Sequence, residues 1–136
     1  MRIQVKDFMT TSVITAKGNT SVGEIRTLMK REGFHAIPIV ETLSTGEVTI
    51  RGIITATDLC REMNDNLSAE QILGPGRVHV IPPNTNAQSA AANMLKHKVH
   101  HLVVMEDGKI IGMISSQDFV TLVANYALDT KTDTVL

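Results

Sequence analysis

The chain has very few aromatic residues: no tryptophan, one tyrosine and three phenylalanines among 136 residues. Proteins that hold single-stranded nucleic acid stack its bases on aromatic rings, so platforms for that task are scarce here. The formal net charge is -1, from 13 basic and 14 acidic residues. A nucleic-acid-binding surface usually shows a basic surplus. Both features argue against nucleic acid as a partner.

Cysteine occurs once, at Cys60, which excludes an intramolecular disulfide and a multi-cysteine metal site. The surrounding residues 58–63 read as helix, so we expect Cys60 to be a small apolar filler there and not a reactive thiol. No apolar run approaches the ~20 residues that a membrane span needs. The first residues also show no signal-peptide core. The sequence therefore predicts a cytoplasmic protein with no membrane partner.

An internal repeat is the strongest positive signal. The sequence GIITATDL at residues 52–59 returns as GMISSQDF at residues 112–119. With 43% hydrophobic and 20% charged residues, the chain has the composition of a soluble globular protein. A repeat that extends through the chain decides the fold before any local signal does.

Each half shows the same order of local signals: a helical turn, an extended run, a helix, two extended runs joined by a hairpin, and a helix that opens at the repeated motif. In the first half these elements are predicted at residues 5–9, 12–15, 22–32, 36–40, 48–52 and from 58 onward. In the second half they are predicted at residues 69–73, 77–81, 87–95, 102–105, 109–112 and from 118 onward.

Neither half, at about 60 residues, buries much core alone. We therefore expect one compact α/β (α+β) module in which the halves pack about a pseudo-two-fold axis. The first repeat is predicted at residues 1–64 and the second at residues 65–127, followed by a polar tail at residues 128–136.

Each motif places a hydroxyl three residues before a carboxylate, where a strand runs into a helix: Thr55 with Asp58, and Ser115 with Asp118. A helix N-terminus with a hydroxyl favours phosphate, and a carboxylate can accept bonds from the two hydroxyls of a ribose. Together these groups indicate a nucleotide site. The alternative is purely structural: the hydroxyls are helix caps, and the aspartates are first-turn charges favoured by the helix dipole.

Taken together, these patterns resemble a tandem pair of cystathionine-β-synthase (CBS) domains, a Bateman module, over about residues 5–126. The resemblance is carried by residues 5–10, 34–40, 52–58, 100–104 and 112–118. It implies two βαββα repeats with no room for an attached catalytic domain. It also implies that clefts between the repeats bind adenosine derivatives.

In that family pattern the aspartate holds the ribose and the Thr or Ser meets the phosphate. These roles carry over to Asp58 with Thr55, and to Asp118 with Ser115. The base is expected against the first strand and the strand after the first helix. With few aromatic rings present, aliphatic and backbone contacts are expected to hold it. The resemblance places the base against Val13, Ile14, Ile37, Pro38, Val80, Ile81 and Leu102.

The chain departs from the family at a phosphate contact. Many members carry an arginine two residues before the proline of the second strand, where this chain has Ala36 and His101. Val103 also replaces the proline that the first half has at Pro38. The two sites are therefore expected to be unequal. Candidates for supplying phosphate charge are His35, His101, Arg51 and Arg77.

Three histidines in residues 97–101 raise the question of a metal site. His97 is expected to end a helix, where an imidazolium suits the dipole. His100 and His101 flank a strand start and point to opposite faces. Because no neighbouring cysteine or carboxylate completes a ligand set, we expect no metal site.

These expectations combine into a stand-alone regulatory module that is not an enzyme and needs no cofactor. It would bind AMP, ADP or ATP, in preference to S-adenosylmethionine, and signal to a regulated protein. A homodimer is expected through the helices after Asp58 and Asp118, because the second helix carries a broad apolar stripe that could pack against its counterpart in a C2 pair, the commonest symmetry. The stripe consists of Phe119, Leu122, Val123 and Tyr126. The alternative is a structural homodimerisation module whose ligand sites are vestigial.

Overall fold

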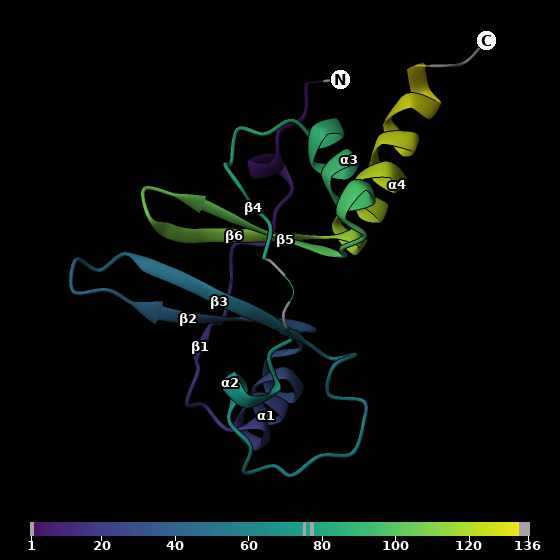
Figure 1. The fold of residues 1–136 in the computed structure, drawn as a ribbon. Helices are drawn as coiled ribbons and strands as arrows, with labels where there is room; N and C mark the ends of the chain where they lie inside the picture. The colour runs from purple at the N-terminus through teal and green to yellow at the C-terminus, as the bar shows by residue number, and fades with distance from the viewer. Residues whose placement is uncertain (1, 75, 77, 134–136) are drawn as a thin grey trace. The chain divides into compact units, whose positions relative to one another are not determined.

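The computed structural model describes residues 2–74, 76 and 78–133. The chain divides into two compact units (Figure 1). The repeat-1 unit contains Val13–Val78 and Asp107–Ile110, and the repeat-2 unit contains Met1–Ser12, His79–Glu106 and Ile111–Leu136. The sequence boundary at residues 64 and 65 stays a prediction about the repeats, since each compact unit also includes a segment from the far side of that boundary.

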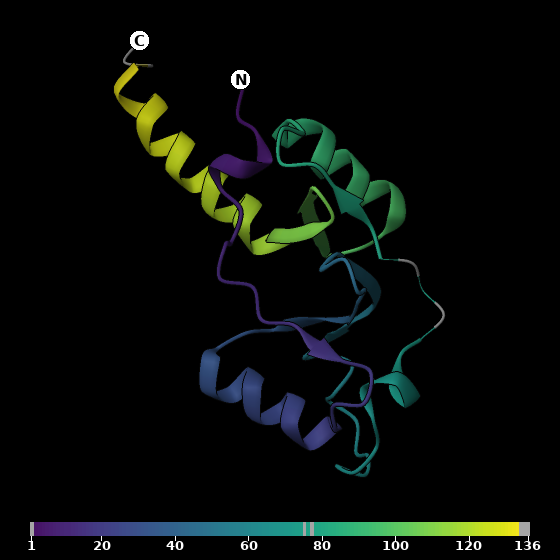
Figure 2. The same ribbon diagram turned by 90° about the vertical axis from the view of Figure 1, so that its left-hand side faces the viewer.

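The repeat-1 unit is a three-stranded sheet with a helix packed against it (Figure 2). Its strands, in sheet order, are β1 (Ala16–Lys17), β2 (Ala36–Thr42) and β3 (Val48–Thr55). β1 runs parallel to β2, and β3 runs antiparallel to it. The helix α1 (Val22–Glu32) buries Val22, Ile25 and Met29 in a core shared with alternate residues of β2. The short helix α2 (Ala69–Ile72) adds Ala69 to that core.

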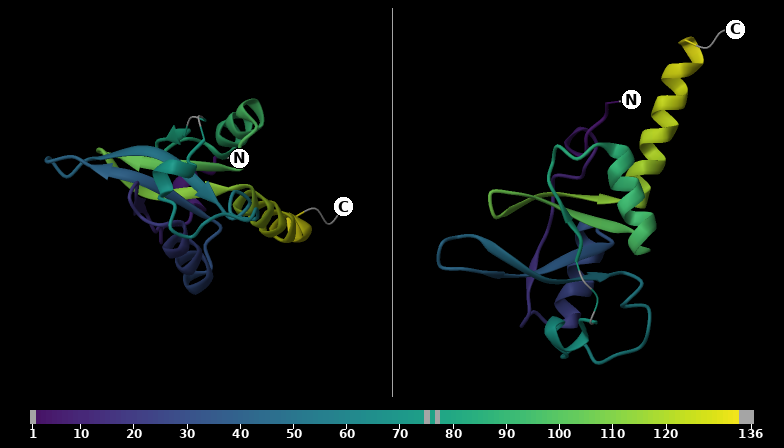
Figure 3. Two further views of the ribbon diagram at one scale, coloured as in Figure 1. Left: turned by 60° about the horizontal axis from the view of Figure 1, so that its bottom comes forward. Right: turned by 45° about the horizontal axis from the view of Figure 1, so that its top comes forward.

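The repeat-2 unit repeats the plan and adds a long helix after its last strand (Figure 3). Its elements are η1 (Val5–Asp7), β4 (Val80–Ile81), α3 (Ala87–His97), β5 (His101–Glu106), β6 (Lys109–Ser115) and α4 (Ser116–Asp133). β4 is parallel to β5, the central strand of the sheet. α4 projects beyond the sheet (Figure 3), and it continues to Asp133, within the segment predicted as a tail. The α+β class expected from the sequence is confirmed, while pseudo-two-fold packing stays a prediction.

The helix boundaries follow local signals in the sequence. Ser21 caps α1 by accepting a bond from the Glu24 N–H over 3.1 Å, and Gly33 ends that helix with a φ of 74°. Asn86 caps α3 in the same way. The C-cap of α3, directly after its last residue His97, is Lys98, which adopts a φ of 54°. For lysine this left-handed region carries a steric cost that a glycine avoids.

The helical turn that opens each repeat is exchanged between the units. It packs against the start of α1 or α3, in the unit formed mainly by the other repeat. In the repeat-2 unit the Val5 N–H donates to Thr85 and the Ala87 N–H donates to Ile3. In the repeat-1 unit the Ala69 N–H donates to Thr20 over 2.7 Å. Val5 and Ala69 are fully buried at these junctions, so each core is completed by a segment distant in sequence.

Two predicted elements are wrong. The first strand lies at Ala16–Lys17, not at residues 12–15, because Ala16 and Lys17 are the residues that pair with β2. The residues before Ala16 have β-forming side chains but no partner strand in the described chain. The helix expected after Asp58 is also absent: residues 56–59 form a turn. Its apolar stripe is short, and the Asn- and Asp-rich residues 64–66 favour turns over helix.

Candidate functional site

The first repeated motif forms a closed hydrogen-bonded turn. Thr55 ends β3, and its N–H donates to Asp58 Oδ2 over 2.8 Å. In return, the Asp58 N–H donates to the Thr55 hydroxyl over 3.3 Å. This reciprocal pattern is that of a capping box. Asp58 is exposed, and the bonds described for its carboxylate use Oδ2 alone.

The second motif has the same reciprocal bonds and two more. The Ser115 N–H donates to Asp118 Oδ2 over 2.8 Å, and the Asp118 N–H donates to the Ser115 hydroxyl over 3.3 Å. The Ser115 hydroxyl can also donate to Oδ2, at 3.2 Å. The Thr10 hydroxyl lies 3.5 Å from the other oxygen, Oδ1. Asp118 is half-buried, so its carboxylate is more fully engaged than that of Asp58.

The structural alternative proposed that these residues act as caps, and the bonds agree with that part of it. In both repeats the hydroxyl and the carboxylate cap a chain turn. Capping, however, uses Oδ2 in each case. The Oδ1 atoms of Asp58 and Asp118 are not needed for it. Capping and ligand binding are therefore compatible roles for one aspartate.

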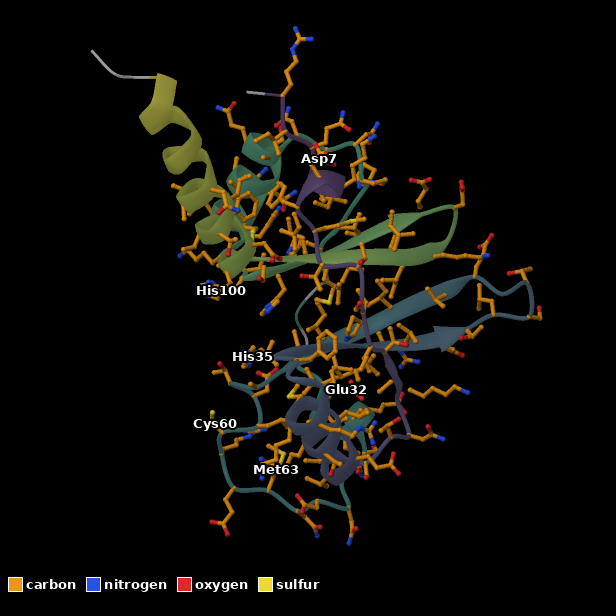
Figure 4. The ribbon with its side chains drawn as sticks, turned by 180° about the vertical axis from the view of Figure 1, so that it is seen from behind. Asp7, Glu32, His35, Cys60, Met63 and His100 are labelled. Atoms are coloured by element: carbon orange, nitrogen blue, oxygen red, sulfur yellow. The ribbon has the colours of Figure 1, made fainter. Side chains whose placement is uncertain are left out.

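The chain continues differently after the two motifs. Asp118 lies in the first turn of α4, whereas Asp58 leads into an irregular loop held by Arg26 of α1. Cys60 lies on that loop and is exposed, with its side chain pointing outward (Figure 4). The expectation that Cys60 fills a helical core position is therefore wrong, because the helix that would have buried it does not form.

Most residues expected to contact the base are buried. Ile37, Ile81 and Leu102 lie in the cores of their units and are at most 5% exposed, so little of these residues is open to a ligand in this structure. Pro38 is among the fully buried side chains. The more accessible members of the predicted set are the half-buried Val13 and Ile14, and Val80, which is 46% exposed.

One histidine that contacts the second motif is His100, which was not among the residues predicted for the site. Its Nδ1 lies 3.1 Å from the Ser116 hydroxyl, and its carbonyl accepts from the Ser116 N–H over 3.0 Å. In the first repeat the His35 carbonyl accepts from the Ala56 N–H over 2.8 Å. His35 and His100 are therefore equivalent and could have been paired by aligning the repeats. His101, the predicted residue, is half-buried at the start of β5.

Arg51, a candidate for phosphate charge, is engaged elsewhere. Its guanidinium pairs with Glu70 over 2.9 Å and with Glu41 over 3.3 Å. These bonds tie α2 to the sheet of the repeat-1 unit. A phosphate would have to compete with two carboxylates, so Arg51 is a poor candidate for the site. Arg77, the other arginine suggested, lies outside the described residues.

His97 stacks on His79, with ring centroids 4.0 Å apart and planes 21° from parallel. The residue as a whole is exposed, but its ring loses hydration where it packs. Desolvation, followed by repulsion from His79 and then from Lys96, lowers the pKa of His97 from its usual 6.5. His97 does end α3, as predicted, but its lowered pKa disfavours the imidazolium that was expected there.

This stack makes stability depend on pH. The pKa of His97 is lower in the folded protein than in the unfolded chain, so the unfolded chain binds more protons as the pH falls below about 6.5. We expect the melting temperature of the wild type to fall more steeply between about pH 7.5 and pH 5 than that of His97→Gln. His35→Gln, outside the stack, serves as the control and should keep the wild-type slope. Equal slopes for the wild type and His97→Gln would contradict this account.

Metal-binding clusters and membrane spans are both absent from the described part of the chain. There, no three histidine, cysteine or acidic side chains are grouped so that they could hold a metal ion. Within the same residues, no helix has the length and apolar character to cross a membrane.

Comparison with known proteins gives consistent matches. The protein is 27% identical over 120 residues to the CBS domain-containing protein YhcV of Bacillus subtilis (strain 168), covering 84% of this chain and 81% of that protein. It is 28% identical over 116 residues to an inosine-5'-monophosphate dehydrogenase of Korarchaeum cryptofilum (strain OPF8), covering 85% of this chain but only 23% of the enzyme.

The fold is similar to the solved CBS domain pair of protein MJ0100, in complex with 5'-methylthioadenosine and S-adenosyl-L-methionine. The TM-score is 0.77 at 24% identity, covering 93% of this chain and 99% of that chain. The family model of the CBS domain matches residues 5–65 and 75–125. Because both repeats are matched, the chain belongs to the CBS domain family and carries a tandem pair of these domains.

Proposed function

We propose that this CBS domain pair is a regulatory module that binds an adenosine-containing ligand, of the AMP, ADP or ATP type, through its two motifs. The observation that supports the proposal is that only one oxygen of each carboxylate is used to hold the backbone of its motif. Oδ2 of Asp58 and of Asp118 holds the backbone of its own motif. The Oδ1 atoms are positioned by those bonds and can accept from ribose hydroxyls.

The hydroxyls supply the phosphate end of the proposed sites. The Thr55 hydroxyl accepts a bond from Asp58, which leaves its own proton free to donate to a phosphate oxygen. The Ser115 hydroxyl lies 3.2 Å from Asp118 Oδ2 and must turn away from it to do the same. The hydroxyl of the first motif is therefore the more available of the two, whereas only the second motif adds a helix N-terminus, that of α4, which favours phosphate.

The nature of the ligand is supported by chemistry and by likeness. A carboxylate oxygen beside a hydroxyl suits a ribose phosphate. The similar MJ0100 domain pair was solved with two adenosine-containing molecules. No constellation of nucleophile and base is needed for binding, so we propose a sensor and not an enzyme. Ligand would alter a partner's contacts only to the extent that it favours one conformation of the module over another.

Thermal unfolding with AMP, ADP, ATP, 5'-methylthioadenosine and S-adenosylmethionine tests this function. A ligand at ~100 times its dissociation constant raises the free energy of unfolding by about 2.7 kcal/mol. We expect a clear increase in melting temperature with at least one of them, and its loss in Asp58→Asn plus Asp118→Asn. Asparagine keeps one acceptor oxygen for the cap but replaces the second with a donor.

Asp107→Asn is the matched control, because Asp107 is an exposed turn residue with a φ of 52° that asparagine tolerates. It should keep the full ligand response. No response of the wild type to any of the five ligands would overturn the proposal. The structural alternative would then be favoured, since Val120 and Val123 of α4 are 60% and 65% exposed and could pack in a homodimer. The predicted interface could use only α4, because no helix follows Asp58.

A further inference from the structure

Arg26 connects α1 to the loop that follows the first motif. Its Nη1 donates to the Leu59 carbonyl over 2.8 Å, and its Nη2 donates to the Arg61 carbonyl over 3.4 Å. Its Nε lies 3.5 Å from Asp65 Oδ1. One half-buried guanidinium thus contacts the loop at three points, beginning at the residue next to Asp58.

These contacts replace the bonds that a helix would supply. In the second repeat the chain after Asp118 is α4, whose carbonyls accept from N–H groups four residues later. After Asp58 there is no helix, and among the described residues no backbone N–H donates to the Leu59 and Arg61 carbonyls that Arg26 contacts. A guanidinium carries five donors in a planar fork, so one side chain can satisfy several carbonyls.

The second repeat has no counterpart to this arginine. The buried residues of the two helices align, Val22 with Ala87 and Met29 with Met94. This alignment places Ala91 of α3 at the position of Arg26. Alanine has no donor to offer, and none is required where α4 satisfies its own backbone. The arginine and the missing helix therefore occur together in the first repeat.

The contacts of Arg26 with Leu59, Arg61 and Asp65 form a clamp on the loop, and this clamp acts on Asp58 through its neighbour Leu59. Leu59 is only 5% exposed, and its N–H donates to Ala56 over 3.1 Å, so Asp58 lies between two fixed points, Thr55 and Leu59. Beyond Leu59, residues 60–62 are exposed and contribute little packing. Without Arg26, Leu59 would keep its buried side chain and its bond to Ala56, and the next described backbone bond from the loop to α1 would be that of the Asp65 carbonyl with the Gly23 N–H, over 3.0 Å.

We propose that Arg26 is a positioning residue for the first motif: it holds the loop so that Asp58 Oδ1 is presented to the ligand. The inference rests on the proposed function, because it assigns a site-specific role in binding. It predicts that the affinity of the first motif depends on Arg26, whereas the affinity of the second does not.

The test measures AMP and ATP binding by calorimetry in two backgrounds. Asp118→Asn leaves the first motif intact, and Asp58→Asn leaves the second. In the first background we expect Arg26→Ala to weaken binding about tenfold, the equivalent of one hydrogen bond from a charged donor. Arg26→Lys, which keeps the charge but not the fork, should restore part of the affinity. In the second background Arg26→Ala should leave binding unchanged.

Arg31→Ala is the matched control, since Arg31 lies on the same helix and pairs only with its neighbour Glu32 among the described residues. It should bind as its parent does. Hydrogen exchange without ligand should be faster at residues 59–65 in Arg26→Ala and unchanged in Arg31→Ala. If Arg26→Ala does not fold, Arg26→Lys in the two backgrounds gives the same comparison.

Equal weakening at both motifs would mean a general loss of stability and would overturn the inference. Unchanged affinity at the first motif would do so as well, while leaving the proposed function intact. If the wild type binds neither nucleotide, the proposed function fails for these ligands. In that case, unaltered hydrogen exchange at residues 59–65 in Arg26→Ala would show that Arg26 does not hold the loop. Faster exchange would show that Arg26 does hold it.

Discussion

Ile114→Ala is expected to lower the free energy of unfolding by about 2–5 kcal/mol, the range for deleting a buried isoleucine side chain to the β-carbon. Ile114 is 0% exposed and belongs to the core of the repeat-2 unit. It directly precedes Ser115, so the cavity would form beneath the second motif. Its counterpart Ile54, 1% exposed before Thr55, should behave alike in the repeat-1 unit.

Chemical denaturation followed by circular dichroism measures this effect. Ile114→Val removes one methylene and should cost only about 0.5–1.5 kcal/mol. Leu43→Ala is the surface control, because Leu43 is 46% exposed in the hairpin of the repeat-1 unit. A loss for Ile114→Ala no larger than that for Leu43→Ala would show that the residue does not lie in a core.

Gly112→Ala is expected to cost about 3 kcal/mol, at the upper end for inserting a methyl group into a packed region. A β-carbon at Gly112 would lie 2.5 Å from Met9 Sδ and 3.0 Å from the Thr10 carbonyl oxygen. The side chain of Met9 can move. The Thr10 backbone cannot readily do so, because it exchanges two 2.9 Å hydrogen bonds with Met113.

Gly52→Ala is the matched comparison in the other repeat. There the new β-carbon would meet Leu73 Cδ2 at 2.5 Å, and all three contacts are with the Leu73 side chain. Because leucine can change rotamer, we expect a cost of only about 1 kcal/mol. Denaturant midpoints of the two variants measure the difference. A larger loss for Gly52→Ala than for Gly112→Ala would contradict the role assigned to the Thr10 backbone.

These glycines explain why the repeated motif begins as it does. In each unit the exchanged opening turn brings a flexible apolar side chain onto the glycine, Met9 onto Gly112 and Leu73 onto Gly52. The sequence shows the glycine twice but not its partner. The partner lies far away along the chain, and only the packing of the exchanged segment brings it close.

Local signals predicted well wherever the deciding atoms are neighbours in sequence. Ser21 and Gly33 bound α1 as expected, since a cap acts on N–H groups within the same turn and a glycine alone adopts positive φ freely. The strand predicted at residues 12–15 was wrong for the opposite reason. A strand needs a partner, and the partner of β1 is β2, to which Ala16 and Lys17 pair.

In the candidate site, too, contacts between near neighbours in sequence were predictable and contacts from distant segments were not. The pairing of Thr55 with Asp58 and of Ser115 with Asp118 could be inferred from a spacing of three residues, because a capping box closes over that distance. Thr10 and Arg26 could not be inferred from the motif, because each reaches it from another segment and an isolated threonine or arginine carries no pattern of its own. His100 could have been found only by aligning it with His35 of the first repeat.

The sequence by itself determined the duplication, the order of most elements and the hydroxyl–carboxylate pairs, all of which depend on periodicity and on contacts a few residues apart. Tertiary structure alone decided which segments complete each core, and that Asp58 is followed by a clamped loop and Asp118 by a helix. These outcomes depend on contacts between residues distant in sequence. Their energies are set by packing and hydrogen-bond geometry that exist only once the chain has folded.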